Sequence, residues 1–331
     1  MPTLLLGAAT HERLRTRLPT TGLDCVVVDD QGTFRSAANE SLAVVPPLHA
    51  AYGNEDTLMG GGARAFVAAI TQAAPAIDWF QSFAAGYEHP AVQRIGAAVK
   101  RFSTCHVQSE AMAEWALWAA LDTFRQGPQH RRQQAEARWQ PQTSREIQGS
   151  RWLIVGFGSV GEAIGRRVRA LGGFVTGVRR RGGTSADADL IRTSLGDADL
   201  SAADVIVLVV PHNNQTNKMV NALFLERLNP QALLLNLGRG GLVDEAALCK
   251  ALDENKLAHA WLDVASTEPL PAESPLWRQP RITLTPHDSP HTPGTRMRQD
   301  EFFLSNLERY LAGTEPLNLV DRSEFPPPGS A

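Results

Sequence analysis

Cysteine, long apolar runs and net charge are all scarce in this chain of 331 residues. Its three cysteines, Cys25, Cys105 and Cys249, match neither a metal-ligand spacing nor a disulfide framework, so we expect a reducing compartment, the cytoplasm. The run Leu4–Leu6 is too short for a signal peptide, and no stretch approaches the ~20 apolar residues of a membrane span. A net charge of −3 gives no reason to expect nucleic acid or an anionic membrane as a partner.

The proportions of hydrophobic and charged residues, 43% and 20%, are those of a soluble globular protein, and the length suits about two domains. In the first part of the chain, short apolar runs alternate with polar or helical segments, and this pattern predicts a small parallel sheet. The runs are Leu4–Leu6, Cys25–Val28, Leu42–Val45 and Ile77–Phe83, with a helix expected over Ala63–Ala74.

Three glycines follow an apolar run in the middle of the chain. Leu153–Val155 predicts a buried parallel strand, and Gly156-Phe157-Gly158-Ser159-Val160-Gly161 follows it directly. The first two glycines allow a tight turn and a close approach of the backbone to a ligand, while the third lets the helix expected over Ser159–Leu171 pack on the strand. The unpaired amides at the start of that helix favour a pyrophosphate, so the unit predicts dinucleotide binding. The alternative is a glycine-rich turn with a purely structural role.

The acid that NAD-binding folds place about 20 residues beyond this turn is absent. About 18 residues after Gly161 comes Arg179, which opens Arg179-Arg180-Arg181 and follows a strand expected over Phe174–Val178. An arginine cannot accept hydrogen bonds from ribose hydroxyls, but its guanidinium can bind a 2′-phosphate. This favours NADP(H) as the cofactor and leaves NAD(H) possible. The alternative is a solvated basic loop kept mobile by Gly182-Gly183.

Further strands are expected along the rest of the chain. They are Val205–Val210, Ala232–Leu237, Ala260–Val264 and Ile282–Thr285, with helical stretches such as Asn221–Leu228 and Asp244–Asn255 between them. Together with the first two strands they predict a doubly wound sheet of about six strands. Ligands of such sheets bind at the carboxyl ends of the strands, so the residues there are the candidates for chemistry.

An arginine, a glutamate and a histidine at three of these ends offer complementary chemistry. Arg239 stands between two glycines, which leave its planar guanidinium accessible to a carboxylate. His287 follows Pro286 and can give or take a proton near neutral pH. Glu268 can orient the imidazole and favour its charged form. Beside a dinucleotide fold, this set indicates carbonyl reduction by hydride transfer.

Each of the three residues also has a plainer explanation. Arg239 could stabilise a turn, Glu268 could be a surface acid, and His287 could belong to a proline-rich loop. His291 complicates the choice of base because it lies four residues beyond His287. A metal site formed by His287, Asp288 and His291 lacks further ligands nearby, so we expect no metal.

With these pieces identified, the sequence resembles the D-isomer-specific 2-hydroxyacid dehydrogenase family from Trp79 onward, whereas the residues before it match in pattern only. The glycine turn and the ordered set of arginine, glutamate and histidine carry the resemblance. The motifs around them are Asn236-Leu237-Gly238-Arg239-Gly240, Leu262-Asp263-Val264, Glu268-Pro269-Leu270-Pro271, Thr285-Pro286-His287, Val209-Val210-Pro211 with Thr216, and the segment from Gly313 to Asp321.

The resemblance implies roles for individual residues. Arg239, Glu268 and His287 would be catalytic, with Arg239 and His287 also binding the substrate. The loop Ala84-Ala85-Gly86 would offer the amides of Ala85 and Gly86 to the substrate carboxylate, although an ordinary turn also explains this loop. Cofactor contacts would come from Gly156, Phe157, Gly158, Ser159, Val160, Gly161, Arg179, Arg180, Pro211, Thr216, Leu237, Gly238 and, near the nicotinamide, Asp263.

The resemblance also implies an architecture. We expect an α/β fold in which a Rossmann-type doubly wound parallel sheet, residues 103–290, is inserted into a second, smaller flavodoxin-like α/β domain formed by residues 1–102 and 291–331. The active site of such proteins is the cleft between the domains, and they usually form homodimers through the cofactor domain.

The expected function is hydride transfer between NADP(H) and a small 2-oxo acid, as in glyoxylate or hydroxypyruvate reductases. Two features depart from the family pattern: Arg179 replaces the usual acid, and Asp288-Ser289-Pro290-His291 replaces a small glycine-containing segment. A dinucleotide-sensing or corepressor-like binding protein is the alternative from another class, although the complete catalytic set argues against it. A relative acting on formate would carry an amide in place of Glu268.

Overall fold

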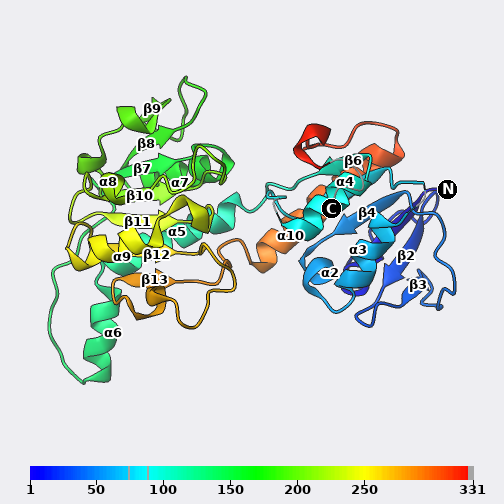
Figure 1. The fold of residues 1–331 in the computed structure, drawn as a ribbon, viewed down its shortest axis with the longest axis horizontal. Helices are drawn as coiled ribbons and strands as arrows, with labels where there is room; N and C mark the ends of the chain where they lie inside the picture. Colours follow the sequence, from blue (N-terminus) through cyan, green and yellow to red (C-terminus); the bar gives the residue numbers. More distant parts are fainter. Residues whose placement is uncertain (74, 88, 327–331) are drawn as a thin grey trace. The chain divides into compact units, whose positions relative to one another are not determined.

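The computed structural model describes residues 1–73, 75–87 and 89–326, and they fall into two compact units (Figure 1). Unit 1 comprises residues 1–107 and the described residues from 296 on, and unit 2 comprises residues 108–295. The boundaries therefore lie at 107/108 and 295/296, where we expected 102/103 and 290/291. Residues 104 and 105 belong to unit 1 because the Thr104 amide donates to the Asn318 carbonyl and the Cys105 amide to the Ala84 carbonyl.

Unit 1 contains a six-stranded sheet in the order β3-β2-β1-β4-β5-β6, with only β3 antiparallel to its neighbour. The strands are β1 (Thr3–Gly7), β2 (Asp24–Val28), β3 (Phe34–Ser36), β4 (Ala50–Gly53), β5 (Trp79–Ser82) and β6 (Arg101–Ser103). The run Leu42–Val45, which we expected to be a strand, is irregular, and the third parallel strand is β4. Pro46 and Pro47 follow the run and lack the amide hydrogens that a ladder needs.

Helices cover both faces of this sheet because its buried side chains alternate along each strand. Leu5 and Phe80 pack with α3 and α4 on one face, whereas Leu4, Leu6 and Trp79 pack with α1 and α10 on the other. The helices are α1 (Ala8–Leu14), α2 (Glu55–Met59), α3 (Ala63–Thr71), α4 (Pro90–Ala98) and α10 (Pro293–Leu311), with a short turn of 3₁₀ helix at Arg322–Glu324. Helix α3 ends at Thr71, and residue 74 of the helix we expected lies outside the described residues.

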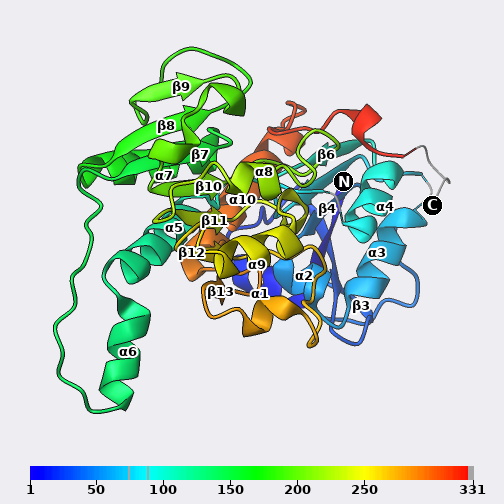
Figure 2. The same cartoon turned by 60° about the vertical axis from the view of Figure 1, so that its left-hand side comes forward.

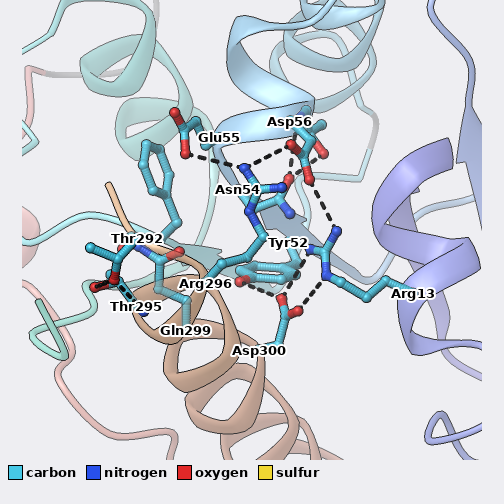
Figure 3. Close-up of polar contacts among 12 residues, drawn as sticks. Arg13, Tyr52, Asn54, Glu55, Asp56, Thr292, Thr295, Arg296, Gln299 and Asp300 are labelled. Carbon is cyan, nitrogen blue, oxygen red and sulfur yellow. Dashed lines mark hydrogen bonds and ion pairs between the residues drawn. The ribbon is translucent and has the colours of Figure 1, made fainter. Parts of the chain in front are cut away.

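A partly buried ionic network ties α10 to the rest of unit 1 (Figure 3). Asp300 accepts hydrogen bonds from Arg13 Nε at 2.5 Å and Nη2 at 3.2 Å, and from the Tyr52 hydroxyl at 3.2 Å. Arg13 also pairs with Asp56 at 3.0 Å, and Arg296 lies 3.3 Å from the same carboxylate. Because the Asp300 side chain is only 4% exposed, its charge depends on these partners.

Unit 2 contains a fully parallel seven-stranded sheet in the order β13-β12-β11-β10-β7-β8-β9. Its strands are β7 (Arg151–Val155), β8 (Phe174–Val178), β9 (Leu190–Arg192), β10 (Val205–Leu208), β11 (Leu233–Asn236), β12 (His259–Leu262) and β13 (Ile282–Leu284). The strand order reverses between β7 and β10, as in a doubly wound fold. The predicted fold class is therefore confirmed, with β9 as a seventh strand beyond the six expected.

Two helical layers cover this sheet. Helices α5 and α7 pack on the face that holds Ile154 and Val207, and α8 and α9 pack on the face that holds Val155 and Leu208. The helices are α5 (Ser109–Phe124), α6 (Gly127–Ala135), α7 (Ser159–Ala170), α8 (Ala222–Leu225) and α9 (Glu245–Asp253), with 3₁₀ turns at Leu195–Asp197, Leu200–Ala202, Gly240–Leu242 and Pro275–Arg278. Helix α6 stands away from the sheet of its own unit in both views (Figures 1 and 2). Within the described residues, no helix is long and apolar enough to cross a membrane.

Candidate active site

The strands of unit 2 end in register at one edge of the sheet. Val178, Val155, Leu208, Asn236, Leu262 and Leu284 form one row of paired residues across six neighbouring strands. The next residue of each strand therefore emerges at the same edge, where ligands of such sheets bind. These residues are Arg179, Gly156, Val209, Leu237, Asp263 and Thr285.

The glycine turn after β7 has the geometry of a phosphate-binding turn. Gly156 has φ of +103°, and a Cβ there would lie 2.5 Å from the Val209 carbonyl oxygen, so this position requires glycine. A Cβ on Gly161 would lie 2.6 Å from the Gly156 carbonyl oxygen, so the glycine allows α7 to pack this close to the turn. A Cβ on Gly158 would meet no described atom within 4 Å. The space beside Gly158 is therefore open for the close approach of a phosphate, whose charge the amino terminus of α7 would stabilise.

Two residues of the turn have side chains that face different ways. Phe157 is only 1% exposed, and its ring lies within 2.4 Å of where a Cβ on Gly177 would stand, so it packs in the core and leaves only its main chain for a cofactor. Ser159 is exposed at the start of α7. The role of Val160, which is partly buried against the core, stays a prediction.

Arg179 follows β8 as predicted, but its guanidinium is engaged within the protein. Its Nε and Nη2 atoms donate to the carbonyls of Arg181 and Thr184, each at 3.1 Å. Its Nη1 atom lies 3.4 Å from Glu162, in the first turn of α7. Arg180, by contrast, is exposed. The basic segment is therefore an ordered turn in which Arg179 binds the main chain and Arg180 faces the solvent.

The segment after β10 forms a closed loop around Pro211 and Thr216. The Thr216 hydroxyl donates to the Pro211 carbonyl at 2.8 Å and accepts from the Asn213 amide at 2.9 Å. The ring of His212 lies 2.6 Å from where a Cβ on Gly241 would stand. The loop therefore packs on the turn that carries Arg239.

That turn is held by a side chain which the motif alone did not single out. Asn236 donates to the Arg239 carbonyl at 3.0 Å and accepts from the Gly238 amide at 3.1 Å. A Cβ on Gly240 would lie 1.9 Å from the carbonyl carbon of Ala265, so only glycine allows the two segments to approach this closely. The turn carrying Arg239 is thus packed directly on the loop that carries Glu268.

Glu268 and His287 form the hydrogen-bonded pair that we expected from the sequence. His287 Nδ1 lies 2.8 Å from Glu268 Oε2, while Glu268 Oε1 accepts from the Ala265 amide at 3.0 Å. The two side chains are 43% and 40% exposed. With Nδ1 bound to the carboxylate, Nε2 is the imidazole atom left to meet a ligand. This arrangement has the geometry of an oriented general acid or base.

Asp263 holds the loop on which His287 lies. Its carboxylate accepts from the Thr285 hydroxyl at 2.5 Å, from the Asp288 amide at 3.0 Å and from the Ser289 amide at 3.2 Å. Its carbonyl accepts from the His287 amide at 2.7 Å, and His287 has φ of +58°, which is uncommon for a residue with a side chain. Asp263 is only 1% exposed, so its carboxylate is enclosed by the groups that donate to it. The expected contact of Asp263 with the nicotinamide stays a prediction.

The remaining predicted residues divide between the units. Leu237 is buried, and Gly238 lies in the turn clamped by Asn236. Ala85 and Gly86 follow β5 in unit 1 and are partly exposed, and their contact with a substrate carboxylate stays a prediction. His291 is exposed, and no three His, Cys, Asp or Glu side chains of the described residues are grouped as metal ligands.

The doubly wound sheet, its phosphate-binding turn and the Glu268–His287 pair define an α/β protein of the dinucleotide-binding class. The family model "D-isomer specific 2-hydroxyacid dehydrogenase, NAD binding domain" matches residues 117–289, which is more than half of the chain. The chain belongs to the D-isomer specific 2-hydroxyacid dehydrogenase family, so the resemblance seen in the sequence is confirmed.

Known proteins agree with this membership. Glyoxylate/hydroxypyruvate reductase A of Yersinia enterocolitica is 29% identical over 238 residues, which are 70% of this chain and 74% of that protein. A D-isomer specific 2-hydroxyacid dehydrogenase family protein from Aeromonas salmonicida has a TM-score of 0.81 at 30% identity, covering 97% of this chain and 99% of that one. An NADPH-dependent glyoxylate/hydroxypyruvate reductase from Sinorhizobium meliloti, solved with NADP and malonate, has a TM-score of 0.71 at 26% identity, covering 98% of each chain.

Proposed function

We propose that the protein is an NADP(H)-linked reductase of small 2-oxo acids. The 2.8 Å contact between His287 and Glu268, at the sheet edge that also carries the glycine turn, is the observation that carries the proposal. The names of the relatives from Yersinia enterocolitica and Sinorhizobium meliloti support glyoxylate and hydroxypyruvate as the first substrates to test. Use of NADP(H), a pool that cells usually hold reduced, supports reduction as the direction.

In the proposed reaction the side chains bind and protonate the substrate. The bound dihydronicotinamide would supply the hydride that reduces the C2 carbonyl. Arg239 binds the carboxylate and the carbonyl oxygen, because a guanidinium offers two parallel donors to such a pair. Protonated His287 donates from Nε2 to the developing alkoxide, and Glu268 stabilises the imidazolium and fixes its orientation through Nδ1.

The residues that would hold the cofactor are those around the glycine turn. Main-chain amides at the start of α7 would bind the pyrophosphate beside Gly158, and Arg179 and Arg180 would face the adenosine end. Pro211, Thr216, Leu237 and Gly238 come from the two neighbouring strand ends.

A spectrophotometric panel tests the function. Purified protein with NADPH or NADH is offered glyoxylate, hydroxypyruvate and phenylpyruvate, and cofactor oxidation is followed by its absorbance. We expect oxidation of NADPH with at least one of the two smaller acids. An absence of oxidation with every acid and both cofactors would favour the dinucleotide-sensing protein, which the complete set of Arg239, Glu268 and His287 otherwise argues against.

We also propose a cytoplasmic homodimer formed through unit 2. Three large apolar side chains on or after α5 are well exposed: Trp118 at 49%, Leu121 at 40% and Trp139 at 100%. Exposed large apolar side chains of this kind are typical of association surfaces. Sedimentation equilibrium should give twice the mass of one chain, and a monomer at micromolar concentration would contradict the proposal. The cysteines, all three unpaired, support a reducing compartment.

A further inference from the structure

A carboxylate lies beside the first arginine of the basic turn, although the strand end itself carries none. Glu162 Oε1 is 3.4 Å from Arg179 Nη1, and Glu162 comes from α7, the helix that follows the glycine turn. The adenosine end of a dinucleotide is expected at this corner, between the turn after β7 and the end of β8. Arg179 and Glu162 therefore present opposite charges where a 2′-phosphate would bind.

The position of Arg179 does not depend on this ion pair. Its Nε and Nη2 atoms donate to the Arg181 and Thr184 carbonyls, both at 3.1 Å, and its side chain is 26% exposed. Two main-chain acceptors therefore hold the guanidinium under the turn. The Glu162 side chain is 39% exposed, so it contributes charge at the corner without being part of the core.

We propose that Glu162 is a specificity-determining residue, which limits the preference for a 2′-phosphorylated cofactor by partly neutralising Arg179. This inference rests on the proposed function, since it concerns the cofactor named there. A dianionic 2′-phosphate that approaches Arg179 also approaches the Glu162 carboxylate, and like charges repel. A ribose that carries only hydroxyls has no such charge. Glu162 thus weakens binding of NADP(H) relative to NAD(H).

Isothermal titration calorimetry with nucleotide fragments tests the proposal without any turnover. The probes are 2′,5′-ADP, which carries the 2′-phosphate, and 5′-AMP, which lacks it. Glu162→Gln should bind 2′,5′-ADP about fivefold more tightly than the wild type, while the affinity for 5′-AMP changes less than about twofold. The gain should shrink as the salt concentration rises, because salt screens exposed charges.

Glu114→Gln is the matched control. Glu114 is an exposed acid of the same unit that lies 4.0 Å from a different arginine, Arg167. The Glu114→Gln variant should bind 2′,5′-ADP and 5′-AMP with unchanged affinities. Glu162→Ala, as a second variant, should also tighten 2′,5′-ADP, and circular dichroism melting confirms that each variant is folded.

Three results would overturn the inference. Unchanged or weaker binding of 2′,5′-ADP by both Glu162 variants would show that the carboxylate does not oppose the phosphate. A loss of 5′-AMP affinity would show that Glu162 accepts hydrogen bonds from the ribose hydroxyls. Failure of the wild type to bind either fragment would contradict the proposed cofactor site, and with it this inference. That failure is distinguishable from the other two because it appears in the unsubstituted protein.

Discussion

At the scale of single residues, the proposed chemistry depends on His287 and on Glu268, the carboxylate that contacts it. His287→Ala removes the group that would protonate the alkoxide, so kcat/KM should fall about 10²–10⁴-fold, or about 3–5 kcal/mol of barrier. Steady-state rates with the best 2-oxo acid of the panel measure the loss. His291→Ala, on the same segment, is the control and should keep most of the activity. Near-full turnover of His287→Ala would remove His287 from the mechanism.

Arg180 offers a second prediction at this scale. Its side chain is exposed, whereas that of Arg179 binds the Arg181 and Thr184 carbonyls, so Arg180 is the guanidinium better placed to reach a 2′-phosphate. Arg180→Ala should raise KM for NADPH at least about tenfold and change KM for NADH little. Arg169→Ala, which removes an exposed arginine paired with Asp189 on the same unit, is the control. Equal losses with both cofactors would refute phosphate binding by Arg180.

The sequence pointed to the candidate catalytic residues more readily than to the residues that support them. The glycine spacing and the order of Arg239, Glu268 and His287 were enough to locate one edge of the sheet. The support of these residues comes from contacts between distant segments, such as Gly240 against Ala265. No local pattern reports that Asp263 binds the main chain of residues 288 and 289, or that Glu162 faces Arg179.

At the scale of elements, β12 carries a partly buried histidine, which should make unfolding depend on pH. Burial lowers the pKa of His259 to about 4, against the weaker opposing effect of Asp122, and its Nε2 lies 2.9 Å from the Thr283 hydroxyl. In the unfolded chain the imidazole of His259 has its ordinary pKa of about 6.5, so the unfolded state takes up a proton before the folded state does. The contribution of neutral His259 to the free energy of unfolding is therefore full above pH 6.5 and is lost as the pH falls toward 4. Urea unfolding should show that His259→Gln loses about 2 kcal/mol less than the wild type between pH 7.5 and 5. Identical pH dependence in the two proteins would refute the assignment.

Elements with a strong apolar run were predicted well, and those without one were missed. The strand Phe174–Val178 has the bounds expected from its pattern, and the helix expected from Ser159 begins at that residue. The strand β9 was missed because Leu190–Arg192 is only three residues long and contains a charged residue. We expected a strand at Leu42–Val45, whereas the strand is β4 at Ala50–Gly53. The expected run is as apolar as a strand, but two prolines follow it.

At the scale of the whole molecule, the stability of unit 1 depends on its anchored carboxyl-terminal helix. Asp300→Asn removes a buried carboxylate from the partly exposed Arg13 guanidinium, so the free energy of unfolding should fall by about 1–3 kcal/mol. Chemical denaturation measures the change. Glu301→Gln is the matched control on the same helix, because its pair with Arg17 is exposed, and it should leave the midpoint unchanged. A similar midpoint for both variants would show that the Asp300 network contributes nothing.

The most direct test of the central claim is the rate of NADPH oxidation by the wild-type protein with glyoxylate and with hydroxypyruvate, repeated with NADH. We expect turnover with at least one of these acids and a higher kcat/KM for NADPH than for NADH. A clear preference for NADH would contradict the cofactor assignment at Arg179 and Arg180, and no oxidation in any combination would contradict the reductase itself.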